Sequence, residues 1–355
     1  MASLDDVFGI SVKPVLSYTE RAEVDGLFRD ALASDHHIVI YGSSKQGKTA
    51  LRQKHVKDRE CIVVGCGPRM TTAGIYQSVL RQIGVTIETV ETETESVKAG
   101  AKASFGFKAL IPWLGGADAS TELSGEAAKQ KAFQSEFIGY DLSDAQSISE
   151  LLKRAGFEKY IVLENFHYLP LDTQRLLAFD LRTFHEAGIR FIILGVWREA
   201  NLLLVHNGDL QDRIAEVPVE PWKDDDFSKV IDKGSTELNI LFATPIRKKF
   251  CGNAYGNVGL LQEFLKISCQ ISGVEQTKQI SFEIADEVVV DETFNRKLLD
   301  QRGQLLNILQ GISGKSRTDG QDPLILPYYL TKIILTVPIT ELTEGVHRRA
   351  LLEKM

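Results

Sequence analysis

Residues 36–49 read HHIVIYGSSKQGKT, an apolar run that passes directly into a glycine-rich loop. The run HHIVIY (36–41) has the composition of a buried strand, and the stretch TALRQKHVK (49–57) after the loop is helical in pattern. The loop itself, GSSKQGKT (42–49), matches G-x-x-x-x-G-K-[ST] in full, which is the pattern of a phosphate-binding loop, or P-loop. Since this motif needs a strand before it and a helix after it, the stretch predicts an α/β fold that binds a phosphorylated ligand.

Each residue type in the loop has a chemical role. The two glycines allow the backbone to curl so that its N–H groups face phosphate oxygens, and the new helix adds the positive end of its dipole. The lysine is expected to reach the β- and γ-phosphates, and the threonine hydroxyl is expected to ligate Mg²⁺. The residues predicted to bind the nucleotide are therefore Gly42, Ser43, Ser44, Lys45, Gln46, Gly47, Lys48 and Thr49.

The rest of the first 221 residues alternates apolar runs with helical patterns. Strands are expected at 61–66, 159–165, 189–196 and 215–221, and helices at 17–34, 71–85 and 171–188. Such alternation predicts a parallel sheet with helices on both faces. The ligand then belongs at the carboxyl ends of the strands, where the P-loop lies.

Composition narrows the class of protein. The net charge of −7 with both signs interspersed argues against a chain dominated by binding to nucleic acid. Four cysteines form no C-x-x-C pair and no zinc spacing, which favours free thiols in a reducing cytoplasm. The acidic N-terminus does not resemble a signal peptide, and no run of eighteen apolar residues predicts a membrane span.

The order of the elements resembles the AAA+/STAND group of P-loop ATPases over about residues 15–270. The segments that carry the resemblance are YTER (18–21), GSSKQGKT (42–49), IYQSVLRQIGV (75–85), IVLENFHYL (161–169), FIILGVW (191–197), NGDLQDR (207–213) and GNVGLLQEFL (256–265). The resemblance implies that ATP and Mg²⁺ are the cofactors. It also implies an ATPase core at 1–221 with an insertion at about 85–146, a helical lid at 222–273, and a mainly helical C-terminal domain at 274–355.

In this family the strand that holds the metal ends in an acid, and the next residue is an acid that polarises the attacking water. By that register Glu164 is the magnesium ligand, together with Thr49, and Asn165 stands where the base should be. An amide can position a water molecule but cannot accept its proton, so hydrolysis should be slow while binding survives. An alternative register makes Glu164 the base and puts Leu163 at the metal position. An aspartate replaced deliberately to trap the ATP-bound state would give the same sequence.

Three further positions follow from the resemblance. Arg213 stands in the region that supplies an arginine to the γ-phosphate of a neighbouring subunit, which implies a homo-oligomer. Trp197 and Arg198 stand where these ATPases keep a polar γ-phosphate sensor, and His167 could assist there or pack at the strand end. Gly259 stands near the place of a lid arginine, which is absent.

Two segments lie outside the common ATPase pattern. Residues 102–116, KASFGFKALIPWLGG, begin with strict alternation and predict a strand or hairpin arm, either folded back on its own domain or contacting a partner. Residues 339–354, ITELTEGVHRRALLEK, could form a winged-helix recognition element that contacts DNA, or a helix that packs against protein.

These observations together predict an ATP-binding switch of the STAND/AAA+ type, akin to bacterial signalling and antiphage-defence ATPases. Its nucleotide state would gate self-association or the engagement of an effector or sensor protein. Two rivals stay open: a DNA-associated AAA+ ATPase, such as a loader or transposition helper, and a structural subunit that holds its nucleotide permanently.

Overall fold

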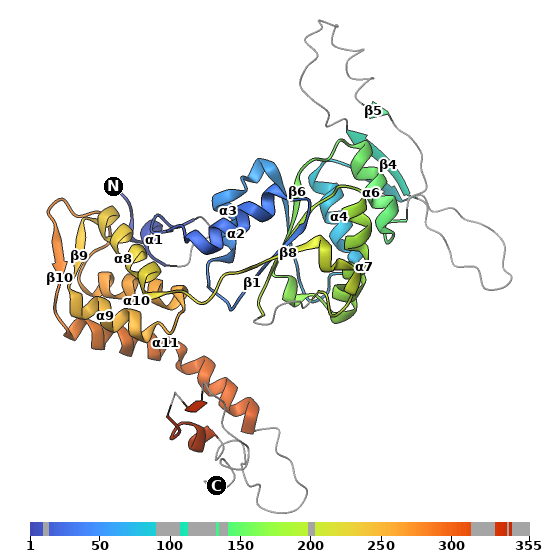
Figure 1. Cartoon of the computed structure of the whole chain (residues 1–355). Helices are drawn as coiled ribbons and strands as arrows, with labels where there is room; N and C mark the ends of the chain where they lie inside the picture. The colour runs from blue at the N-terminus through green and yellow to red at the C-terminus, as the bar shows by residue number, and fades with distance from the viewer. Residues whose placement is uncertain are drawn as a thin grey trace, which may run out of the picture.

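A computed structural model describes residues 1–9, 14–89, 107–112, 133–134, 141–197, 203–313, 331–338 and 341–342. Within them the chain forms two packed units, which lie side by side in Figure 1. One is built on a five-stranded sheet and the other on helices, and each has its own hydrophobic core. No helix of the described residues is long and apolar enough to cross a membrane.

The first unit is built on a parallel sheet in the order β2-β6-β7-β1-β8. The strand that leads into the P-loop, β1, lies between β7 and β8, and all neighbouring pairs run parallel. This arrangement confirms the α/β fold that the sequence predicts. The strands are β1 (His37–Tyr41), β2 (Cys61–Gly65), β6 (Tyr160–Glu164), β7 (Phe191–Gly195) and β8 (Ile214–Pro218).

Helices cover both faces of this sheet, so its strands are apolar on both sides. One face packs on α2 (Ala22–Ala33) and α3 (Lys48–His55), and the other on α4 (Thr72–Gln82), α6 (Ala145–Arg154) and α7 (Leu171–Glu186). Side chains alternate between the faces along each strand. In β6, Val162 packs on the face of α2 and α3, whereas Ile161 and Leu163 pack on the face of α4, α6 and α7.

The second unit forms the helical lid that the sequence predicts. Its helices are α8 (Asp224–Leu238), α9 (Thr244–Asn253), α10 (Val258–Ile271) and α11 (Val288–Ser313), with a two-stranded parallel sheet of β9 (Ile240–Phe242) and β10 (Phe282–Ile284). Its core also includes Leu4, Val7 and Phe8, so the N-terminal helix α1 (Leu4–Val7) packs on the lid rather than on the sheet (Figure 1). The same core extends past residue 273 to Ile284 and Val290.

The predicted insertion contains a small antiparallel sheet. Its strands are β3 (Thr86–Thr89), β4 (Phe107–Pro112) and β5 (Phe133–Gln134), in the order β3-β4-β5. The alternating segment is therefore a strand from residue 107 to 112, and β4 and β5 lie at the end of the molecule away from the lid (Figure 1). The remainder of the predicted arm and most of the predicted winged helix lie outside the described residues.

Candidate nucleotide site

The P-loop forms a tight turn between β1 and α3. Three of its residues have left-handed or positive φ angles: Gly42 (147°), Lys45 (64°) and Gly47 (85°). Gly42 is also required for space, because a Cβ there would lie 2.7 Å from a methyl group of Val219. Gly47 precedes the first helical residue, and no side chain caps the N–H groups of that first turn. The start of α3 therefore presents donors and a positive dipole end for an anion.

Lys48 lies back across this loop. Its Nζ donates to the carbonyl oxygens of Gly42 (2.8 Å) and Ser43 (2.6 Å). Burial lowers the pKa of the Lys48 ammonium to about 8, and the nearby Glu220 carboxylate opposes that shift. Thr49 is exposed in the first turn of α3. The loop thus has the shape and the donor groups that a polyphosphate requires, with Lys48 and Thr49 as the side chains that would meet it.

Glu164, at the carboxyl end of β6, faces the P-loop helix. Its Oε1 accepts a hydrogen bond from Nη2 of Arg52 on α3 at 3.2 Å. The Arg52 side chain is 4 % exposed, and its Nε has no partner among the described residues. Leu163 is fully buried in the core on the opposite face of the sheet. Of the two residues weighed for the metal position, only Glu164 therefore presents its side chain on the side of α3.

Asn165 does not continue the strand. Its φ angle is 58°, and its carbonyl accepts from the Tyr168 N–H (2.9 Å) as the chain turns into the short helix η2 (Phe166–Tyr168). Asparagine and aspartate tolerate this left-handed conformation better than other non-glycine residues. The turn thus gives a conformational reason for a short polar residue here, and a glutamate would fit it less well.

His167 and Trp197 lie beside this turn. The backbone N–H of Val196, at the end of β7, donates to Nδ1 of His167 at 3.3 Å. Burial, and the charge of Lys48, lower the pKa of His167. Because Nδ1 accepts the Val196 N–H, the neutral ring carries its proton on Nε2. His167 is thus anchored at a strand end, and it lies close enough to the P-loop for the charge of Lys48 to act on it. A role at the γ-phosphate stays a prediction.

Trp197 is packed rather than free to act as a polar sensor. Its ring stacks parallel to Tyr41 with centroids 6.3 Å apart and meets Phe166 edge-on at 6.1 Å. It occupies the space that a side chain on Gly195 would need. Arg198, the other residue weighed for this place, lies outside the described residues.

Arg213 lies far from the P-loop of its own chain. It ends the short helix η3 (Gly208–Arg213), just before β8, and the first residue of β8 pairs with His37 at the amino end of β1. The P-loop follows the opposite end of β1. The Arg213 guanidinium donates to the Asp209 carbonyl (2.5 Å) and lies 3.8 Å from Glu186. The structure therefore does not bring Arg213 together with the other predicted site residues.

The lid and its connection to the core contact the P-loop directly, through contacts that sequence patterns do not predict. Glu220, just after β8, accepts from the N–H (2.9 Å) and hydroxyl (3.0 Å) of Ser43. Nε1 of Trp222 donates to the Gln46 carbonyl at 3.4 Å, and the Arg21 guanidinium lies 3.9 Å from the centre of the Trp222 ring.

The Gln46 side chain reaches the lid. Its Oε1 accepts from the N–H of Val258 (3.4 Å), and its Nε2 lies 3.5 Å from the Gly256 carbonyl. The first turn of α10 lies so close to the loop that a Cβ on Gly259 would be 2.4 Å from Cβ of Lys45. The position assigned to a lid arginine therefore has no room for a side chain in this arrangement.

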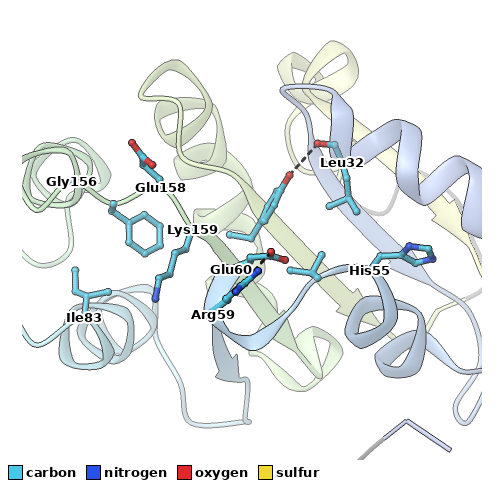
Figure 2. A pocket seen from close by; sticks show the side chains of 11 residues that line it. Leu32, His55, Arg59, Glu60, Ile83, Gly156, Glu158 and Lys159 are labelled. Carbon is cyan, nitrogen blue, oxygen red and sulfur yellow. Dashed lines mark hydrogen bonds and ion pairs between the residues drawn. The ribbon is translucent and has the colours of Figure 1, made fainter. Parts of the chain in front are cut away.

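A separate pocket of about 640 Å³ opens near the amino end of β6, at the end of the sheet opposite to the P-loop. Figure 2 shows it between the end of α2 at Leu32 and the segment from Gly156 to Lys159. Its exposed charges are balanced, with Arg59 and Lys159 against Glu60 and Glu158. This pocket lies away from the P-loop and does not select a charged ligand of either sign.

Comparison with known proteins supports the fold. No family model matches the sequence, and no curated protein matches it. The chain is similar to a Walker-type ATPase of Pyrococcus abyssi, with 16 % identity, a TM-score of 0.52, and coverage of 98 % of this chain and 92 % of that one. The chain therefore has the fold of a P-loop ATPase.

Two further solved structures are more distant. Cdc6p of Pyrobaculum aerophilum is 14 % identical with a TM-score of 0.45, and the match covers 77 % of this chain and 68 % of that one. The Orc1 protein of Aeropyrum pernix, solved in complex with DNA, is 13 % identical with a TM-score of 0.47, covering 94 % and 77 %.

Proposed function

We propose that the chain binds ATP and Mg²⁺ at its P-loop and acts as a switch of the STAND/AAA+ type, whose nucleotide state sets the position of the lid. The observation that carries this proposal is the contact of one loop with both the lid and the segment that connects the lid to the core. Ser43 and Gln46 bind the connection at Glu220 and Trp222, while Lys45 and Gln46 bear against the start of α10. A ligand that rearranges the loop must then also rearrange the lid.

Each residue would bind the polyphosphate or the metal according to its place in the site. The N–H groups at the start of α3 and the Lys48 ammonium would hold the polyphosphate, and the Thr49 hydroxyl and Glu164 carboxylate would hold Mg²⁺. A bound Mg²⁺ would draw phosphate charge away from the bridging oxygen. In that arrangement Glu164 shares its charge between the ion and Arg52, which weakens its hold on the metal.

Slow hydrolysis is part of the same proposal. Asn165 carries no basic group, and the loss of a general base lowers a rate by about 10²- to 10⁴-fold. Arg213 faces away from its own P-loop, which suits a contribution to the site of a neighbouring copy in a homo-oligomer. Nucleotide-dependent assembly, or engagement of an effector or sensor protein, would then be the output, as in bacterial signalling and antiphage-defence ATPases.

The test is equilibrium binding of a fluorescent ATP analogue with Mg²⁺ to the wild-type chain and to Lys48→Ala. A charged hydrogen-bonding group contributes about 1.5–3 kcal/mol, so the affinity should fall by about 10- to 100-fold. Lys54→Ala is the matched control, because Lys54 lies on the same helix, is half exposed, and pairs with Glu20 rather than with the loop. Equal binding by all three proteins would refute the proposed site.

Size-exclusion chromatography with and without ATP separates the switch from its rivals. The switch predicts a change of assembly with nucleotide. Tightly held ADP with no change of assembly would favour a structural subunit. DNA binding that weakens steeply with salt would favour a DNA-associated ATPase.

A further inference from the structure

The P-loop is joined to the last helix of the lid by a chain of three charged side chains. Oε1 of Glu263 on α10 accepts from Nζ of Lys45 at 2.9 Å, and its Oε2 pairs with Nζ of Lys297 on α11. We propose that Lys45, Glu263 and Lys297 form a relay that holds the lid on the P-loop until a polyphosphate takes Lys45, and that passes this change on to α11. The inference rests on the proposed function for its ligand alone.

The pair of Glu263 and Lys297 is more buried than the pair of Lys45 and Glu263. Lys45 is therefore the residue of the relay that can exchange its partner. The side chains of Glu263 and Lys297 are 17 % and 14 % exposed, whereas that of Lys45 is 49 % exposed. Burial alone raises the pKa of the Glu263 carboxyl, but hydrogen bonds from Lys297 and Lys45 outweigh it, so the net pKa is lowered. Glu263 is thus charged at neutral pH and stays paired with Lys297 when Lys45 leaves.

The backbone of Lys45 lies directly against the first turn of α10. Its φ angle is left-handed, and Gly259 lies against it so closely that a Cβ on Gly259 would be 2.7 Å from the Lys45 carbonyl oxygen. Asn257 caps α10 by accepting from the Leu260 N–H at 3.0 Å. The cap and the glycine together fix how the first turn of α10 sits on the loop, one turn before Glu263.

Next to Glu263, aromatic side chains pack α10 tightly against α11. Phe264 on α10 and Phe294 on α11 meet edge-on with centroids 4.9 Å apart, and Phe250 on α9 contacts both rings. A shift of α10 therefore moves α11 with it, since packed aromatic side chains do not deform continuously. The C-terminal part of the chain follows directly from α11.

The backbone contact between Gly259 and Lys45 is tested in the nucleotide-free chain by hydrogen exchange at the amides of α10 and α11. Gly259→Ala puts a methyl group against the Lys45 backbone and should raise exchange in both helices by about tenfold or more. Gly252→Ala is the matched control, since Gly252 lies in lid helix α9 and a Cβ there meets nothing within 4 Å. Unchanged exchange in Gly259→Ala would overturn the relay, because α10 would then not be held on the loop at Lys45.

The exchangeable contact is tested with Lys45→Met, which keeps the length of the side chain and removes the charge. Breaking a half-exposed ion pair should raise exchange in α10 by about two- to fivefold without nucleotide. In the wild type, ATP should produce a similar rise in α10 and α11, and in Lys45→Met it should add nothing. Lys54→Met, an ion-paired lysine of similar exposure on α3, should behave as wild type.

A full ATP response of α11 in Lys45→Met would overturn the relay. If ATP fails to bind the wild type at all, the proposed function falls, but the nucleotide-free comparison of Lys45→Met with Lys54→Met still decides the relay. Equal exchange in those two variants refutes it.

Discussion

The two halves of the candidate nucleotide site differ in how far they keep the pattern of a P-loop ATPase. In the phosphate-binding half, the loop from Gly42 to Thr49 has every residue of the motif and the curled backbone that the motif requires. In the half proposed for hydrolysis, Glu164 is paired with Arg52, and Asn165 stands where the family resemblance predicts an acid. On the proposed function, one half would hold phosphate and the other would be poorly equipped to activate water.

The difference between the two halves indicates which step, ATP binding or ATP hydrolysis, would act on the lid. The loop that would hold ATP is contacted by the lid through Lys45 and Gln46 and by the connection through Glu220 and Trp222. The strand end that would break ATP has no such contact with the lid among the described residues. The chemical energy of binding is therefore better placed to move the lid than the energy of hydrolysis.

The largest effect should come from Asn165→Asp, which restores a carboxylate next to Glu164. Hydrolysis should rise by up to about 10²- to 10⁴-fold, because a base can then take a proton from the attacking water. Phosphate release at saturating ATP measures this. The fold should be unaffected, since aspartate also tolerates the left-handed φ of 58°.

Asn165→Gly is the control for that change, because glycine keeps the turn and adds no carboxylate. Its hydrolysis rate should be no higher than that of the wild type. An increase in both variants would mean that the turn, and not the missing base, limits the rate, and the contrast between the two halves would then be drawn in the wrong place.

A change of pH should have an effect of intermediate size on ATP affinity, and this effect tests the phosphate-binding half. The pKa of Lys48 is lowered to about 8, so the ammonium loses its proton as pH rises through 8. Bound phosphate favours the charged lysine, so ATP affinity should be level below pH 7.5 and fall towards tenfold per pH unit above 8.

Lys48→Arg is the control for the pH profile, because a guanidinium keeps its charge throughout this range. Its affinity should be flat from pH 7 to 9, whatever its absolute value. A wild-type profile as flat as that of Lys48→Arg would show that Lys48 does not meet the phosphates.

The smallest effect should come from Arg52→Gln, which frees Glu164 from its ion pair. The enhancement of ATP binding by Mg²⁺ should grow by about three- to tenfold, since an ion pair of this kind contributes roughly 1 kcal/mol. Titration of ATP with and without Mg²⁺ measures it. Asp58→Asn serves as control, because Asp58 is the other carboxylate near Arg52 and is 95 % exposed. A smaller Mg²⁺ effect in Arg52→Gln would mean that Arg52 helps to place Glu164 for the metal.

The parts of the molecule that the sequence predicted have local signals. The apolar runs at 36–41 and 159–165 correspond to β1 and β6, and the P-loop follows from its own residues, whereas the helical lid is implied only by the family resemblance. The sheet order and the facing of Glu164 towards α3 follow from the way the strands pair, which a single sequence does not display.

The contacts between the lid and the loop could not be predicted in the same way. Glu220 meets Ser43 across 177 positions of the sequence, and Val258 meets Gln46 across 212. Both depend on the angle at which the lid docks. The sequence shows Gly259 only as a position without the lid arginine, and its close approach to Lys45 supplies the steric reason. At position 165 the family resemblance predicts an acid, and the left-handed backbone supplies a conformational reason for asparagine there.

A single-turnover experiment tests the central claim most directly. Excess wild-type chain is mixed with labelled ATP and Mg²⁺, and the bound ATP and ADP are separated at intervals. ATP that is bound and stays intact over many minutes, while Asn165→Asp converts it to ADP, is the predicted result. The account is contradicted if the wild type retains no ATP, or if it converts bound ATP as fast as Asn165→Asp.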